Sequence, residues 1–265
     1  MRQYYRHRPA VLAVGFLTVI LPFLANVFGL DNGRVSLRAN RPRASVRGSN
    51  QGALEFLGRW GYGPAKAVEV SGQQAFLGSG TMLLTLDTTD PAKPELLGQL
   101  DLGSPIAQIV KRDRYLFVLC SNLVIVDVSQ PAAPRRVADW GTAERIFKMR
   151  LQGNYAYLLD VWRGLTILDI SQPQNPWLAG RYSPPESCWD LAISGNRLYL
   201  SSGPLIFITD ISQPTRPIYL ASYEKAVYSI AAAGTYLYIS AAAPFGGPNS
   251  LQVLDTSNPE DVRLV

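Results

Sequence analysis

The sequence has almost no histidine and little cysteine. Its only histidine, His7, lies before a long apolar run, so the rest of the chain contains no imidazole. This excludes Ser-His-Asp and Cys-His mechanisms and most zinc sites from that part. Phosphate-binding loops, G-x-S-x-G and H-E-x-x-H motifs are also missing. We therefore expect no cofactor, no metal site and no enzyme activity.

Cys120 and Cys188 lie far apart in the chain, in different copies of the repeat described below. At that separation we expect two small buried side chains rather than a disulfide, although an oxidising compartment would permit a bridge.

Acidic residues are scarce near the N-terminus. Residues 1–53 contain eight arginines and one acidic residue, a net charge of +7, whereas residues 54–265 contain 17 basic and 19 acidic residues, a net charge of −2. The basic character therefore belongs to the N-terminal segment. The remainder offers no electrostatic attraction for nucleic acid, so we expect no nucleic-acid partner.

One long uncharged run, residues 10–30, has the length of a membrane-spanning helix. Arginines in residues 1–9 are expected to stay in the cytoplasm. We predict an uncleaved anchor, with a cleaved signal peptide as the alternative. The arginines of residues 31–53 weaken the charge asymmetry that sets orientation, and the segment is otherwise typical of a linker. We expect the following domain on the extracytoplasmic side, in a periplasm or on the cell surface.

The rest of the chain is organised by a segment written five times, each copy ending its apolar part on an aspartate. The copies are LLTLDTTDPAKP from Leu83, LVIVDVSQPAAP from Leu123, ILDISQPQNP within residues 165–176, IFITDISQPTRP from Ile206 and LQVLDTSNPEDV from Leu251. The aspartates recur every 40 to 45 residues, roughly, which is typical of a solenoid or a propeller.

Each unit has the short, alternating or continuous apolar runs of β-strands. In the third unit we expect strands at residues 149–152, 155–160, 165–169 and 177–182, with a tight turn at Gly153. The prolines after each aspartate interrupt the ladder because proline has no amide hydrogen. Four antiparallel strands per unit predict an all-β fold over residues 54–265, a β-propeller of about five blades.

This wording resembles the LVIVD repeat family, whose name is the string from Leu123 to Asp127 as it stands here. The resemblance covers residues 54–265, and the D-x-S-x-P-x-x-P extension makes it fairly specific. The last unit departs from it, because Val262 occupies the position of the second proline. The resemblance implies a β-propeller of the kind often found on bacterial or archaeal cell surfaces, and it implies no reaction.

The ring needs a closing strand. Residues 54–60, LEFLGRW, match residues 95–100, ELLGQL, the expected fourth strand of the first unit. We therefore expect the N-terminal strand to complete the last blade, whose other strands come from the C-terminal end. Residues 263–265 compete for the same edge.

The repeated aspartates have a local role that needs no chemistry, because short polar side chains bond backbone amides two residues on and hold the turn before proline. We expect this structural role at Asp87, Asp127, Asp169, Asp210 and Asp255. Asp87 and Asp90 together offer too few oxygen ligands for calcium.

Binding residues are expected on one rim, where connections between second and third strands meet the connections between blades. Trp162, Arg163 and Phe245 stand in loops that break the repeat, and Arg145, Trp189 and Tyr223 lie between units. Trp, Tyr and Arg are typical of protein-binding surfaces. The alternative, packing between blades, applies to Trp60, Trp140 and Tyr182.

We therefore expect a non-catalytic, membrane-anchored propeller that binds protein, as an accessory or structural subunit of a membrane complex. A carbohydrate-acting hydrolase or lyase is the first alternative, with Asp160, Glu186 and Asp190 as the available acids. A secreted binding module is the second.

Overall fold

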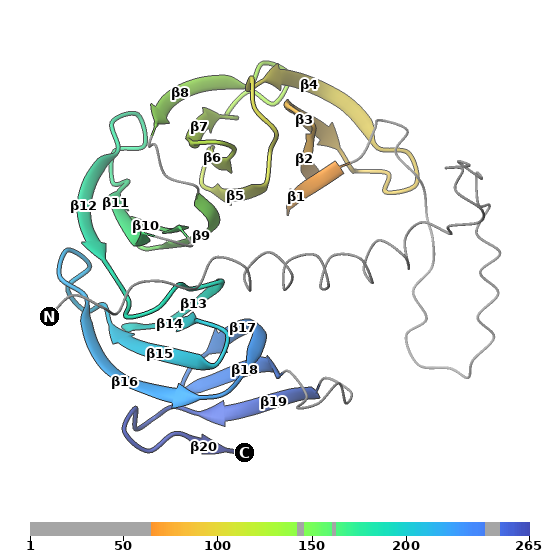
Figure 1. Ribbon diagram of the computed structural model, residues 1–265. Coiled ribbons are helices and arrows are strands. Elements are labelled where there is room, and N and C mark those ends of the chain that lie inside the picture. The colour runs from red at the N-terminus through yellow and green to blue at the C-terminus, as the bar shows by residue number, and fades with distance from the viewer. Residues whose placement is uncertain (1–64, 142–145, 161–162, 242–249) are drawn as a thin grey trace, which may run out of the picture. The chain divides into compact units, whose positions relative to one another are not determined.

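The computed structural model describes residues 65–141, 146–160, 163–241 and 250–265 (Figure 1). Contacts divide the chain into residues 1–55 and 56–265, and every described residue belongs to the second unit. The predicted anchor, the linker and the strand at residues 54–60 lie outside the described residues. Within those residues, no helix has the length and apolar character needed to cross a bilayer.

The described residues form five four-stranded antiparallel sheets, each built from consecutive strands. The first comprises β1 (Ala65–Ser71), β2 (Gln74–Ser79), β3 (Met82–Asp87) and β4 (Glu95–Asp101). The second comprises β5 (Gln108–Arg112), β6 (Tyr115–Leu119), β7 (Leu123–Asp127) and β8 (Arg135–Trp140). The third comprises β9 (Ile146–Gln152), β10 (Tyr155–Asp160), β11 (Gly164–Asp169) and β12 (Trp177–Tyr182). The fourth comprises β13 (Asp190–Ser194), β14 (Arg197–Ser201), β15 (Leu205–Asp210) and β16 (Ile218–Glu224). The fifth comprises β17 (Val227–Ala233), β18 (Tyr236–Ala241), β19 (Ser250–Asp255) and β20 (Arg263–Leu264).

These sheets confirm the predicted all-β class and the four strands per repeat. In each sheet the repeated aspartate ends the third strand and pairs with the first residue of the fourth, as in Asp127 with Arg135 and Asp255 with Arg263. The turns between first and second strands contain a residue with positive φ, a glycine such as Gly153 in four sheets and Asp113 in the second. A left-handed residue there gives the tight turn that the register needs.

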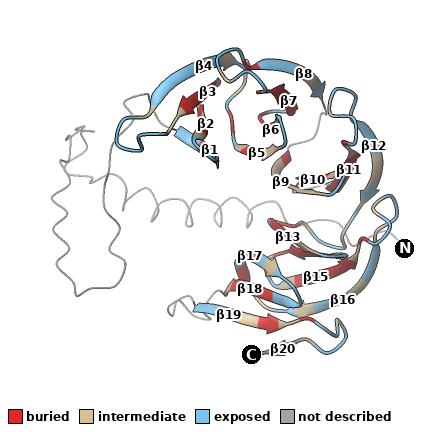
Figure 2. Ribbon diagram, turned by 180° about the vertical axis from the view of Figure 1, so that it is seen from behind, coloured by how far each residue is buried: buried red, intermediate tan, exposed pale blue. Residues whose placement is uncertain are grey.

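Burial follows strand position within each sheet (Figure 2). All five residues of β7, the LVIVD strand, are buried, whereas the fourth strands β4, β8, β12 and β16 combine exposed and intermediate residues. A strand covered on both faces has a continuous apolar run, and an edge strand does not. The continuous apolar sequence of β7 therefore reflects a central strand of its sheet that is covered on both faces.

Four apolar clusters join the successive sheets, and each contains the same type of residue pair. An aromatic side chain of the second strand packs with an aliphatic side chain from the first strand of the next sheet. The pairs are Phe76 with Ile109, Phe117 with Met149, Tyr157 with Leu191 and Tyr199 with Ile230. A fifth, smaller cluster, which includes Leu84 and Leu86, belongs to the first sheet alone.

Polar contacts repeat between sheets as well. The last residue of a first strand donates to the turn glycine of the next sheet, at 2.5 Å from Gln152 Nε2 to the Gly195 carbonyl and 2.8 Å from Ser194 Oγ to the Gly234 carbonyl. Arg112 makes the corresponding contact with Gly153 at 2.5 Å. Burial joins all four pairs of successive sheets, and these hydrogen bonds join the second to fifth sheets at equivalent positions.

The fourth strand of the fifth sheet departs from the prediction. Its residues come from the C-terminal end, because β20 pairs Leu264 with Leu254 and Arg263 with Asp255. At these two positions the expectation that residues 54–60 supply the strand is therefore wrong. The competing C-terminal residues pair there instead, in the register that the fourth strands have in the other four sheets. β20 pairs with Leu254 and Asp255 only, at the end of β19 far from Ser250.

Candidate functional site

The predicted rim lies where second strands end and third strands begin. The antiparallel order brings the connections between sheets to the same edge. Of the six predicted binding residues, the structure describes Arg163, Trp189 and Tyr223. Arg145, Trp162 and Phe245 lie outside the described residues, so their expected role stays a prediction.

Trp189 and Tyr223 have different surroundings on this rim. Trp189 lies immediately before β13, and its side chain is 43% exposed while its amide donates to the Ser201 carbonyl at 2.7 Å. Tyr223 is partly buried against the cluster between the fourth and fifth sheets. Trp140 and Tyr182 pack in the same way against the two preceding clusters. Tyr223 therefore packs between sheets, and Trp189 presents an aromatic surface to solvent.

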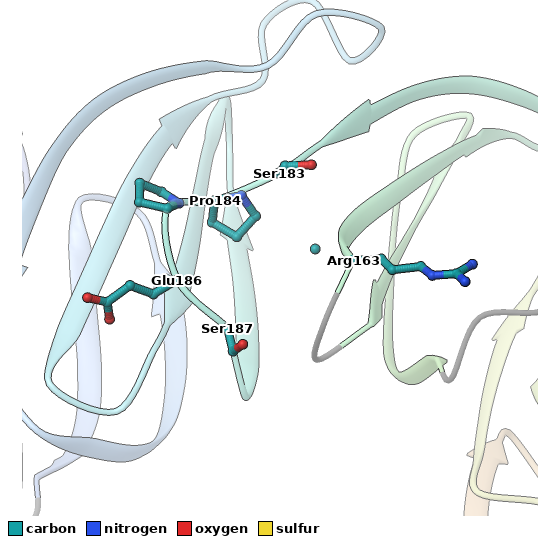
Figure 3. A pocket seen from close by; sticks show the side chains of 7 residues that line it. Arg163, Ser183, Pro184, Glu186 and Ser187 are labelled. Atoms are coloured by element: carbon teal, nitrogen blue, oxygen red, sulfur yellow. The ribbon is translucent and has the colours of Figure 1, made fainter. Parts of the chain in front are cut away.

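A pocket of about 170 Å³ lies on the rim between the third and fourth sheets. Arg163 and Gly164 line one side, and the connection from Ser183 to Ser187 lines the other. In Figure 3 the guanidinium of Arg163 and the carboxylate of Glu186 point in opposite directions. The pocket is therefore lined by one glycine, two prolines and four polar residues, and its two charged side chains point away from each other.

Gly164 explains why the two segments approach so closely. Its φ is 80°, and a Cβ there would lie 2.6 Å from Pro184 Cδ and from the Tyr182 carbonyl oxygen. Only glycine combines this backbone conformation with that contact. Asp160, the last residue of β10, accepts the amide of Arg163 at Oδ1 at 2.9 Å.

The acids considered for a hydrolase are bound to different partners. Asp160 is buried and accepts the amide of Arg163, while Glu186 Oε2 accepts a hydrogen bond from Ser202 Oγ at 3.0 Å. Asp190 forms an ion pair with Lys148 Nζ at 2.9 Å and is buried. A glycosidase needs two carboxylates facing one bond, one of them able to give a proton. The observed contacts instead use these carboxylates as hydrogen-bond acceptors within the fold.

The surroundings of Asp190 favour its charged form. Ser229 Oγ donates to Oδ2 at 2.7 Å, and the amide of Ile230 donates to the same oxygen at 3.1 Å. Burial by itself raises the pKa of Asp190, but the hydrogen bonds from Ser229, Lys148 and Ile230 outweigh it, so the net pKa lies below its usual value. Asp190 is therefore an ionised structural link between the third, fourth and fifth sheets.

Asp190 belongs to a row of polar residues that the sequence interpretation missed. Gln108, Lys148, Asp190 and Ser229 occupy the same position in the first strands of the second to fifth sheets, four residues before each turn. Gln108 binds both the amide and the carbonyl of Met149, at 2.9 and 3.0 Å. Aligning the units on their turns, rather than on the repeated aspartates, would have found this row.

Neither cysteine is poised for chemistry. Cys120 follows β6 directly and Cys188 precedes β13, and both are free and buried. Burial raises the pKa of Cys120 to about 11 and that of Cys188 to about 12. Both thiols are protonated at neutral pH, and the thiolate is the reactive form. In the part of the chain that the structure describes, no group of three or more His, Cys, Asp or Glu residues is placed to hold a metal.

A scan against protein-family models matches five LVIVD repeats, at residues 62–101, 111–142, 146–183, 186–225 and 226–265. The chain belongs to the LVIVD repeat family. The resemblance expected from the wording of the repeat is thus confirmed, with one repeat for each of the five sheets. No curated protein matches the sequence.

Solved structures similar to these LVIVD repeats share little sequence. A functionally unknown protein from Desulfotomaculum acetoxidans matches with a TM-score of 0.63 and 14% identity, over 78% of this chain and 72% of that one. The β-propeller domain of Cps50 (Swd1) from Myceliophteria thermophila matches with a TM-score of 0.58 and 12% identity, over 76% and 71%. The computationally designed protein Ika8 matches with a TM-score of 0.60 and 12% identity, over 76% of this chain and 60% of its own. These likenesses show a β-propeller type of fold.

The repeated aspartate at the end of the third strand of each LVIVD unit makes an Asx turn. In every unit a side-chain oxygen accepts the amide two residues on, at distances of 2.7 Å for Thr89 to Asp87, 2.9 Å for Ser129 to Asp127, 2.8 Å for Ser171 to Asp169, 2.6 Å for Ser212 to Asp210 and 2.9 Å for Ser257 to Asp255. The backbone hydrogen bond from Ser129 is the main cause that lowers the pKa of Asp127. These contacts hold the loop that precedes each fourth strand.

Proposed function

We propose that this protein is a non-catalytic β-propeller, anchored in a membrane by residues 10–30, that binds a protein partner through the rim around Arg163 and Trp189. In this proposal it is an accessory or structural subunit of a membrane-associated complex. One observation carries it: an exposed Trp189 lies on the same rim as a pocket lined by Arg163, Gly164 and residues 183–187.

The residue chemistry supports binding over turnover. Asp160 and Asp190 are buried and bound within the fold, and both thiols are protonated at neutral pH. Enzymes that transfer protons need a group whose pKa lies near the working pH and that reaches the substrate. The buried carboxylates Asp127 and Asp190 both have their pKa lowered, away from that range.

The composition of the rim supports a protein as the ligand. Trp and Arg are the residues that most often account for binding energy at protein interfaces, where loss of one such side chain costs about 2 kcal/mol or more. A pocket lined by polar residues and prolines fits a side chain or loop of a partner. An uncharged run of residues 10–30 supports a partner in or beside the membrane.

The proposal is tested on the native protein, extracted gently from its own membranes. Companions present in stoichiometric amount are identified by mass spectrometry for the natural protein and for a variant carrying Arg163→Ala and Trp189→Ala. Trp177→Ala is the matched control, because Trp177 is 53% exposed at the start of β12, on the opposite edge. We expect the rim variant to lose a companion that the control keeps, while both melt like the natural protein.

Equal retention of every companion by both variants would overturn the rim as the binding surface. A protein extracted alone in all cases would overturn the subunit role. Intact mass separates the anchored form, which retains residues 1–30, from a secreted module that starts after them. Protection of the repeats from external protease in intact cells, with cleavage after outer-membrane or wall permeabilisation, supports a periplasmic position.

A further inference from the structure

One edge of the sheets carries the tight turns between first and second strands and the loops that follow the repeated aspartates, opposite the rim around Arg163 and Trp189. We call it the Asx-turn edge. In the second to fourth sheets it comprises residues 111–115, 127–136, 152–155, 169–178, 194–197 and 210–219, all of them described. Each of these three sheets packs against a described sheet on both sides. This part of the edge therefore does not depend on what completes the first or the fifth sheet.

Large apolar side chains begin the fourth strands of the third and fourth sheets on this edge. Trp177 is 53% exposed and Leu178 42%, while Ile218 is 56% exposed and Tyr219 47%. The loop before β16 packs against β12, because a Cβ at Gly180 would lie 2.9 Å from a carbonyl oxygen of that loop. In Figure 2 the two strands follow one another along the outside of the sheets. The two exposed pairs thus belong to one apolar patch, and such patches usually mark a contact site.

Arginines of the second sheet lie beside this patch. The Arg114 guanidinium lies over the Tyr115 ring, 5.0 Å from its centroid, and donates to the Tyr115 hydroxyl at 2.8 Å. The same hydroxyl accepts a hydrogen bond from Gln174 Nε2 at 3.2 Å, three residues before Trp177. Arg135 is exposed at the first position of β8, the position that Trp177 has in β12. These contacts place positive charge next to the aromatic start of β12.

Charge is unevenly distributed along the Asx-turn edge. In the second to fourth sheets the edge contains seven basic and four acidic residues, a net charge of +3. Three of the four acids are repeated aspartates, whose side chains accept amides of their own turns. In the first sheet, residues 71–74 and 87–96 contain one basic and three acidic residues, and so do residues 233–236 and 255–264 of the fifth. Positive charge therefore gathers where the apolar patch lies.

We propose that the Asx-turn edge of the second to fourth sheets docks on the anionic surface of a lipid bilayer. Tryptophan and tyrosine favour the headgroup depth of a membrane, because their rings are apolar and carry one polar group. Arginines nearby are attracted to anionic headgroups. In the docked state Trp177 and Tyr219 lie at that depth, and Arg114, Arg135 and Arg216 face the lipid phosphates.

The proposed anchor keeps this edge close to lipid, so the inference rests on the span at residues 10–30 in the proposed function. Residues 31–64 connect that span to β1, and even fully extended these 34 residues reach about 120 Å at most. A tether of this kind raises the effective concentration of a weak binding surface at its target. An acidic protein would match the charge alone, whereas the tether and the exposed rings favour the bilayer. Docking by this edge turns the opposite rim, with Arg163 and Trp189, away from the lipid and towards a partner.

Quenching of tryptophan fluorescence by brominated phosphatidylglycerol tests the docking on the full chain, reconstituted into phosphatidylcholine vesicles that contain it. Flotation of the vesicles shows whether the chain is anchored. Residues 1–59 contain no tryptophan, so quenching does not report on the span. Trp189→Phe is the control for Trp177→Phe, because Trp189 is 43% exposed on the opposite edge. We expect Trp177→Phe to remove most of the quenched signal and Trp189→Phe to retain it, with equal melting temperatures.

A charge reversal tests the electrostatic attraction. Arg216 is exposed six residues after its repeated aspartate, and Lys93 has the same repeat position on the acidic edge of the first sheet. One basic residue near an anionic bilayer contributes about a fivefold change in binding, so Arg216→Glu should lower the ratio of docked to undocked protein at least about fivefold. The lower ratio is seen as lost quenching of Trp177, which high salt should also reduce. Lys93→Glu is the matched control and should leave the quenching nearly unchanged.

Four outcomes overturn the docking. Unchanged quenching in Trp177→Phe, on a chain that floats with the vesicles, shows that this edge does not meet lipid and leaves the anchor intact. A chain that does not float removes the anchor itself, so failure of the proposed function is told apart from failure of the docking alone. Equal quenching in Arg216→Glu and Lys93→Glu excludes the electrostatic attraction. A companion that Trp177→Ala releases from the native protein identifies a protein on this edge in place of lipid.

Discussion

Leu123 and Leu251 are the same residue at the same position of two LVIVD units, and they differ in their neighbours. Leu123 is fully buried in the cluster between the second and third sheets, whereas Leu251 is 76% exposed. Replacing each by alanine removes the same atoms. The difference between the two variants therefore measures what a neighbouring sheet contributes.

The expected magnitudes follow from burial. Leu123→Ala removes a fully buried side chain and leaves a cavity, which lowers the free energy of unfolding by about 2–5 kcal/mol. Leu251 retains only about a quarter of its possible burial, so its truncation loses about 0.5 kcal/mol or less of the ~2 kcal/mol that full burial of a leucine provides. The two variants should differ by at least about 2 kcal/mol.

Urea unfolding followed by tryptophan fluorescence is a suitable assay, at a protein concentration low enough to keep the chain monomeric. Trp140 packs against the same cluster as Leu123, so its emission reports directly on that region. With a denaturant slope of about 3 kcal/mol per molar urea, Leu123→Ala should lower the midpoint by about 1 M. Leu251→Ala should move it by less than about 0.2 M.

An equal loss in the two variants at low concentration would refute the reasoning, because it would mean that Leu251 is buried within the monomer. Far-ultraviolet circular dichroism before unfolding shows whether either variant retains its β-structure.

Three further predictions concern the inside of the fold. The pKa of Asp190 is lowered by folding, so its contribution to stability is present above the unfolded value, about 3.9, and is lost as pH falls through the folded value. Asp190→Asn should therefore flatten the loss of stability below about pH 4 in acid-unfolding curves. Gly98→Ala would place a Cβ 2.5 Å from a carbonyl oxygen of the second sheet's loop and should cost about 1–3 kcal/mol in thermal unfolding, whereas Gly141→Ala meets nothing within 4 Å and should cost less than about 0.5 kcal/mol. Cys120 and Cys188 should react with a thiol reagent only on unfolding, and rapid labelling of the folded protein would contradict their burial.

The sequence pattern of the repeat was sufficient to predict the strands. Runs such as LVIVD are apolar without interruption because β7 is covered on both faces, and the prolines that follow each aspartate end the third strand for lack of an amide hydrogen. Local chemistry of this kind acts within a few residues. The third unit accordingly has its strands within three residues of where its pattern predicts them.

The candidate site was less accessible to sequence reasoning. Tyr223 and Trp189 are both aromatic residues between units, yet one packs between sheets and the other is exposed. Asp160, Glu186 and Asp190 are all acids off the repeated position, and each binds a different part of the fold. Composition does not distinguish these cases, because the partners lie at different distances along the chain: 3 residues from Asp160, 16 from Glu186 and 39 from Asp190 in the case of Ser229.

The sequence by itself determined the strand content, the number of units and the turn at each repeated aspartate, since these depend on neighbours within one unit. Only the tertiary structure decided which strand completes the fifth sheet, how Asp190 joins three sheets, and that Leu251 is exposed where Leu123 is buried. The physical reason is that burial and ion pairing between sheets depend on what packs alongside. Identical residues at equivalent repeat positions, such as Leu123 and Leu251, therefore differ in how far they are buried.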